Sequence, residues 1–127
     1  MFLIKCINAY EAIGKLMDEK TDYKSAHALV CLRAKLKIHA EFFACEERAL
    51  LCEFAKKDEK GNPIVDAAGN FEFEEGKDIS DFYKRRDELC KTEAEIDDLP
   101  VSVKIPEKIS PSAVEALLDF VSFKEEM

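Results

Sequence analysis

Residues 23–57 read YKSAHALVCLRAKLKIHAEFFACEERALLCEFAKK, without a glycine or a proline. Nothing in this stretch interrupts a helix, because glycine and proline are the residues that most strongly disfavour a helix interior. Thr21 or Asp22 can cap its start, since their short polar side chains accept hydrogen bonds from free amides of the first turn. The sequence therefore predicts one long helix over residues 22–57, about 50 Å in length at 1.5 Å per residue.

The apolar residues of this helix fall on two opposite sides when they are placed at 100° per residue. One group, named here the leucine stripe, consists of Leu29, Leu32, Leu36, Ala40, Phe43, Leu50 and Phe54. The other, named the cysteine stripe, consists of His27, Cys31, Ala34, Ile38, Phe42, Cys45, Ala49 and Cys52. A surface helix needs only one apolar stripe. We therefore expect the leucine stripe to face the chain's own core, and the cysteine stripe to be an interface with another helix of the chain or with a partner subunit.

Shorter elements are predicted around the long helix. Asn8 and Glu11 have the spacing of a capping box at the start of a first helix. Ser110 followed by Pro111 is a start signal for the last one. The expected elements are a helix over 9–20, the long helix over 22–57, a β-hairpin over 63–73, a helix over 78–96, a strand over 101–105 and a helix over 111–123.

These elements define a mainly α fold of the α+β class. We expect an elongated helical hairpin or bundle around the long helix, with a small β-hairpin or three-stranded sheet and a C-terminal helix. The length of 127 residues fits a single helical domain over 1–127.

Composition limits the setting of the protein. Hydrophobic residues make up 47% and charged residues 36%, which is typical of a globular chain. The five cysteines are odd in number and lie in apolar helical patterns, which indicates reduced, buried thiols instead of a disulfide framework. No apolar run approaches the roughly 20 residues of a membrane helix, and the start lacks the pattern of a signal peptide. We expect a cytoplasmic or virion-associated protein.

The charge is unevenly distributed. Residues 1–57 carry 10 Lys and Arg against 8 Asp and Glu, whereas residues 58–127 carry 9 against 19. An acidic chain repels phosphate backbones, and Arg33, Lys35 and Lys37 scatter around the helix instead of forming one basic face. We therefore expect neither nucleic acid nor a membrane as a partner.

Two groups of residues are candidates for a functional site. His27 and Cys31 lie one helical turn apart and could supply two ligands to a metal, but a structural zinc needs four. Glu72-x-x-Glu75 and Glu95-x-x-Asp98 resemble the paired acidic motifs of all-α nucleotide pyrophosphohydrolases, whose carboxylates hold Mg²⁺ on facing helices. Here Glu72 falls in the strand-like segment Phe71-Glu72-Phe73, and Asp98 lies two residues before Pro100, so the helical geometry is missing. No catalytic, cofactor-binding or metal-binding residue is predicted, and the four carboxylates remain an alternative only.

The order of elements resembles a family of small uncharacterised proteins encoded by bacteriophages and prophages of Gram-positive bacteria. The resemblance is carried by residues 7–12 (INAYEA) with Lys15-Leu16, by the long charged helix, by residues 58–62 (DEKGN) with 69–71 (GNF), by residues 99–103 (LPVSV), and by residues 109–111 (ISP). It covers nearly the whole chain and implies no catalytic residue. The cysteine count and Phe42-Phe43 depart from the family's pattern, which puts its oligomeric behaviour in doubt here.

We therefore expect a non-enzymatic protein that binds another protein or forms a homo-oligomer, in the role of a phage-derived assembly or accessory protein. The alternatives are a Mg²⁺-dependent enzyme resembling the nucleotide pyrophosphohydrolases, and an acidic regulator that binds a host protein.

Overall fold

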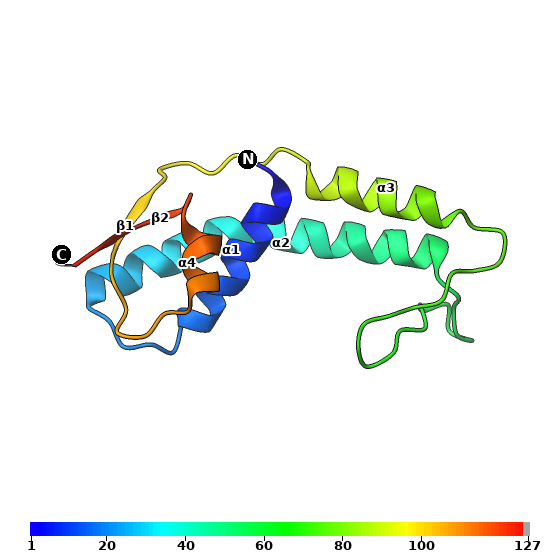
Figure 1. Ribbon diagram of the computed structural model, residues 1–127, viewed down its shortest axis with the longest axis horizontal. Helices are drawn as coiled ribbons and strands as arrows, with labels where there is room; N and C mark the ends of the chain where they lie inside the picture. Colours follow the sequence, from blue (N-terminus) through cyan, green and yellow to red (C-terminus); the bar gives the residue numbers. More distant parts are fainter. Residues whose placement is uncertain (126–127) are drawn as a thin grey trace.

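The computed structural model describes residues 1–125 and is mainly helical, of the α+β class. Its elements are α1 (Leu3–Leu16), α2 (Tyr23–Phe54), α3 (Ile79–Cys90), β1 (Val101–Lys104), α4 (Pro111–Leu117) and β2 (Val121–Lys124). Figure 1 shows α2 running through most of the molecule, with α1, α4 and both strands beside its N-terminal half and α3 along its C-terminal half. Residues 126 and 127, which the expected domain included, lie outside the described part of the chain.

The long helix forms as its sequence predicts. The carboxylate of Asp22 accepts a hydrogen bond from the amide of Ser25 at 3.3 Å, so Asp22 is the N-cap. The helix ends at Phe54, three residues earlier than expected, because Ala55 is extended and Lys56 bonds to a later segment. The leucine stripe faces inward as expected: only Ala40 is half-buried, and the other six members are buried.

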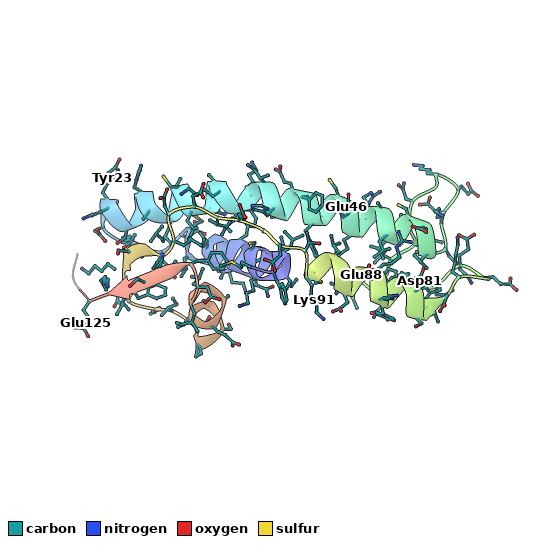
Figure 2. All side chains as sticks on the ribbon, turned by 90° about the horizontal axis from the view of Figure 1, so that it is seen from above. Tyr23, Glu46, Asp81, Glu88, Lys91 and Glu125 are labelled. Atoms are coloured by element: carbon teal, nitrogen blue, oxygen red, sulfur yellow. The ribbon has the colours of Figure 1, made fainter. Side chains whose placement is uncertain are left out.

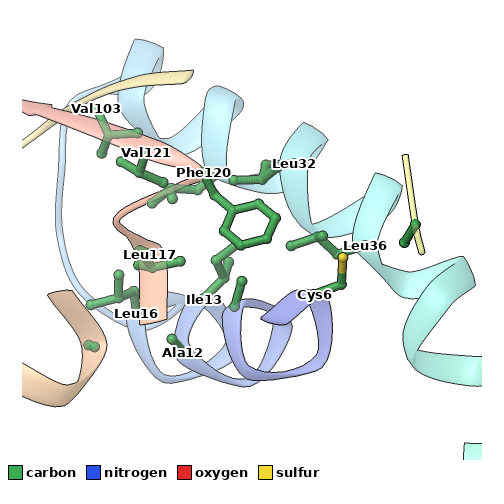
Figure 3. Close-up of a cluster of buried hydrophobic side chains, with 14 of the residues drawn as sticks. Cys6, Ala12, Ile13, Leu16, Leu32, Leu36, Val103, Leu117, Phe120 and Val121 are labelled. Atoms are coloured by element: carbon green, nitrogen blue, oxygen red, sulfur yellow. The ribbon is translucent and has the colours of Figure 1, made fainter. Parts of the chain in front are cut away.

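The main core lies between α1, α4, the strands and the N-terminal half of α2. Phe120, which is 1% exposed, reaches between α1 and α2 in Figure 3, with Leu32 and Leu36 on one side and Ile13 on the other. The hydroxyl of Ser25, fully buried within α2, accepts a hydrogen bond from the amide of Lys104 at 2.8 Å and so ties β1 to the long helix.

A second, smaller core surrounds the C-terminal end of α2. Phe82 of α3 is its central residue, with its ring centroid 5.5 Å from that of Phe54 and 5.2–5.3 Å from those of Phe71 and Phe73. Edge-on ring pairs at such distances are favourable aromatic contacts. Two ion pairs hold α3 to α2, from Arg85 to Glu53 at 2.7 Å and from Arg86 to Glu47 at 3.1 Å. Among residues 1–125, no buried residue belongs to both cores.

The first helix begins earlier than predicted. It covers Leu3–Leu16 instead of 9–20, and Asn8 lies inside it and is no cap. Its start is fixed by a distant segment: the Leu3 amide donates to the Thr92 carbonyl at 2.7 Å, and Phe2 bridges to Glu93. The same pairing explains why α3 stops at Cys90 instead of residue 96, since the chain after it runs extended past the start of α1.

The C-terminal prediction was wrong in its second half. The helix expected over 111–123 starts as predicted, with Ser110 capping the amide of Ala113, but it ends at Leu117. The chain then forms β2, which pairs in parallel with β1, Val101 opposite Val121 and Lys104 opposite Lys124. The strand expected over 101–105 therefore exists over Val101–Lys104, but in a two-stranded parallel sheet and not with the segment 63–73. The two strands read VSVK and VSFK, a repeat that could have revealed their pairing.

The expected hairpin over 63–73 is present only as isolated bridges. Val65 bridges to Phe71 as a hairpin requires, and residues 55 and 57 bridge to 73 and 63. Two turns of the same sequence pattern, Asp-x-x-Gly-Asn, shape the segment. In each turn the aspartate Oδ1 accepts hydrogen bonds from two backbone amides. The amides of Lys60 and Asn62 donate to Asp58, and those of Ala68 and Asn70 donate to Asp66.

Candidate interaction surface

The cysteine stripe lies on the outside of the molecule. Cys52 is half-buried and the other seven members are exposed, Ile38 to 71% and Phe42 to 48%. Figure 2 shows the reason: α2 forms one long side of the molecule, and α1, α3, α4 and both strands lie to the same side of it. Within residues 1–125, no segment covers this face, so a neighbouring helix of the same chain is not its cover.

Two further side chains extend this apolar face. Tyr23 and Val30 are 83% and 51% exposed and lie beside the cysteine stripe on the helical wheel. Both fall just outside the eight aligned positions of the cysteine stripe, so its three-and-four spacing does not include them. Their large size and their position on the same side of the wheel were the signal that could have found them.

The edges of the cysteine stripe carry charges of both signs. On one edge, Lys37 pairs with Glu41 one turn later at 3.9 Å. On the other, Lys35 reaches the carbonyl of Asp97 at 3.2 Å and the carboxylate of Asp98 at 3.6 Å. These charged side chains are exposed, so their present contacts contribute little to stability and can be exchanged for others.

His27 and Cys31 lie together at the N-terminal end of the stripe. The sulfur of Cys31 is 3.7 Å from Nε2 of His27, and the imidazole stacks on Tyr23 with ring centroids 6.0 Å apart. These contacts are ordinary side-chain packing on the helix surface and do not require a metal ion. In the part of the chain that the structure describes, no three His, Cys, Asp or Glu side chains are close enough together to hold a metal ion.

The four carboxylates of the alternative site are not brought together. Glu72 and Glu75 precede α3, whereas Glu95 and Asp98 follow it, so this 12-residue helix lies between the pairs. Glu72 forms an ion pair with Lys56 at 3.1 Å and Asp98 one with Lys35 at 3.6 Å. No facing helices aim these groups at one point, which is the geometry that the Mg²⁺ hypothesis required.

Local contacts account for the shifted pKa values of two titratable groups. Burial raises the pKa of the Cys6 thiol, which is in the main core. A hydrogen bond from Arg85 lowers the pKa of Glu53, at the contact between α2 and α3. A surface depression of about 560 Å³ is lined by residues of α1, of α4 and of the segment after α4. Lys5 and Asp119 are among them and form an ion pair at 3.2 Å. Each of these features has a structural explanation.

Comparisons with known proteins give no further direction. No protein-family model, curated protein or solved structure matches this chain. Among residues 1–125, none of the helices combines the length and the apolar character needed to cross a membrane. The case for the cysteine stripe as an interaction surface therefore rests on the structure alone.

Proposed function

We propose that this chain is a non-catalytic interaction protein that binds another protein chain through the cysteine stripe of α2. One observation carries the proposal: an apolar face extends along a 32-residue helix, and the described residues leave it exposed to water. Contiguous apolar patches of this kind are uncommon on monomers and mark binding surfaces.

The energetics support the same role. Complete burial of an isoleucine or phenylalanine side chain contributes about 1.5–3 kcal/mol. Ile38 and Phe42 remain 71% and 48% exposed, so a partner recovers a large part of that free energy by covering them. The mixed charges at the edges suit a polar rim around an apolar interface centre.

The resemblance to small phage and prophage proteins supports an assembly or accessory role over an enzymatic one. An acidic regulator would instead bind a host protein through the acidic half of the chain, residues 58–127. Neither alternative gains a separate observation: the four carboxylates of the enzyme hypothesis are divided between the two ends of α3.

The thiols of the cysteine stripe give a direct test. Cys31 and Cys45 are exposed in the single chain, whereas Cys6 is buried and serves as an internal reference. A maleimide should label Cys31 and Cys45 rapidly in dilute purified protein. In a native extract of cells that make the protein, labelling of both should slow at least several-fold. Equal rates in the two samples would mean that nothing covers the stripe, and the proposal would then be wrong.

A further inference from the structure

We infer that the partner on the cysteine stripe is a second copy of this chain, lying antiparallel to the first, an inference that rests on the proposed function. The spacing of the stripe is nearly symmetric about the level of residue 40 on the helix. Each member before this level has a counterpart at the same distance after it, to within one residue. Around a two-fold axis at this level, the facing pairs are Ile38 with Phe42, Ala34 with Cys45, Cys31 with Ala49, and His27 with Cys52.

The sizes of the paired residues match in this arrangement. The bulky Ile38 and Phe42 meet at the centre, each contacting the other type in the second copy. On either side, alanine faces cysteine, so two layers of small side chains let the helix backbones approach closely. Interaxial distances between packed helices depend directly on the side chains at the contact.

The charges at the edges match as well. In an antiparallel two-fold pair, the same edge of each helix meets its copy. On one edge Lys37 faces Glu41 of the second copy, and on the other Lys35 faces Glu46 of the second copy. The two-fold axis repeats both contacts, which gives four attractive pairs. All of these side chains are exposed in the single chain and free to reorient.

A parallel pair fits less well. Opposite edges would then meet, and Lys35 would face Lys37 of the second copy, although Glu46 would face Arg48. The attraction and the repulsion roughly cancel. Each cysteine of the stripe would also lie opposite its own copy, a difference that makes the two orientations distinguishable by experiment.

The first experiment measures the mass of the full chain in reducing buffer across the micromolar range by sedimentation equilibrium. We expect a concentration-dependent dimer. The double variant Ile38→Glu/Phe42→Glu should weaken its dissociation constant about a hundredfold or more, because the axis repeats each change. Leu118→Glu is the matched control, since Leu118 is similarly exposed, to 66%, but lies outside the stripe, and it should leave the dimer intact. Circular dichroism confirms that all variants fold.

The second experiment fixes the orientation by mild oxidation. The variants A49C and A34C place a thiol opposite Cys31 and Cys45 of the second copy, within the short range that a disulfide requires. Both variants should give covalent dimers in much higher yield than the natural sequence, in which each stripe cysteine faces alanine or histidine. Efficient crosslinking of the natural chain through Cys45 to its copy would instead show a parallel pair and overturn the antiparallel inference.

The two proposals fail separately. A purified chain that stays monomeric at every concentration overturns the second-copy inference. If Cys31 and Cys45 are nevertheless protected from maleimide in the cell extract, the partner is a different protein and the proposed function stands. If they are unprotected there, both proposals are wrong.

Discussion

Single residues at the N-terminal end of α2 connect the long helix to the rest of the fold. Ser25 is fully buried, and its hydroxyl is the acceptor for the amide of Lys104 in β1. We predict that Ser25→Ala lowers the free energy of unfolding by about 1–3 kcal/mol, because the amide loses its partner inside the protein. Ser102→Ala, on the exposed side of β1, is the control and should change little. Urea unfolding followed by circular dichroism measures both, and equal losses would contradict the prediction.

Asp22 makes the start of the same helix sensitive to pH. The hydrogen bond with Ser25 lowers the pKa of the Asp22 carboxyl below its usual range. A lowered folded-state pKa means that the stabilisation is complete above the unfolded pKa of about 4 and is lost as the pH falls through the lower folded value. The difference in urea midpoint between the natural chain and Asp22→Ala should therefore be largest near neutral pH and shrink below about pH 4.

Asp22→Asn separates the titration from the cap. Asparagine is a good N-cap but does not titrate. The difference in urea midpoint between Asp22→Asn and Asp22→Ala should therefore stay constant through the acid range. A difference between the natural chain and Asp22→Ala that is unchanged from pH 7 to pH 2 would contradict the assigned role of the carboxylate.

At the scale of elements, local signals predicted what local interactions determine. The long helix followed from the absence of glycine and proline, and Asp22 and Ser110 cap their helices as expected. The start of α1 and the strand β2 could not be found in this way, because distant segments fix them. Phe2 has no side-chain cap and is held by Glu93, and residues 121–123 leave a helical pattern to pair with β1.

The candidate surface was predicted for the same reason as the long helix. A periodicity of three and four places the cysteine stripe on one face whatever the remaining fold is. Whether another helix of the chain packs on this stripe could not be predicted, because the positions of α1 and α3 depend on tertiary contacts. Only the structure shows that both pack on the leucine stripe and leave Ile38 exposed.

The paired turns after α2 make a prediction about glycine. Gly69 has a φ of +84°, a left-handed conformation that costs other residues roughly 1–2 kcal/mol, and asparagine less than alanine. Gly69→Ala should therefore speed the hydrogen exchange of the Asn70 amide about tenfold, a factor that corresponds to 1.4 kcal/mol. Gly69→Asn should produce a smaller effect. Indistinguishable rates for the two variants would argue against a strained turn.

For the whole molecule, the two cores at opposite ends of α2 predict uneven stability. Phe82 is 3% exposed and central to the smaller core. Removal of such a buried ring costs about 3–5 kcal/mol. Phe82→Ala should therefore accelerate hydrogen exchange in α3, while amides of α1 keep most of their protection.

Tyr83→Ala is the matched control for this prediction. Tyr83 is the next residue of α3 and is 60% exposed. Its ring contacts those of Phe82 and Phe73 from the outside of the smaller core, so its loss should change exchange in α3 much less than the loss of Phe82. If Phe82→Ala accelerated exchange equally in α1 and α3, the molecule would unfold as a single cooperative unit, and the two cores would not be independent.

The position of Phe120 between α1 and α2 also bears on the timing of folding during translation. Lys5 pairs with Asp119, 114 positions later, and the ring of the next residue fills the space between the two helices. The space between α1 and α2 cannot be filled before Phe120 has been synthesised. Until then, Ile13 and Leu32 lack the ring that covers them. Closure of the main core should therefore follow the synthesis of α1 and α2 and not accompany it.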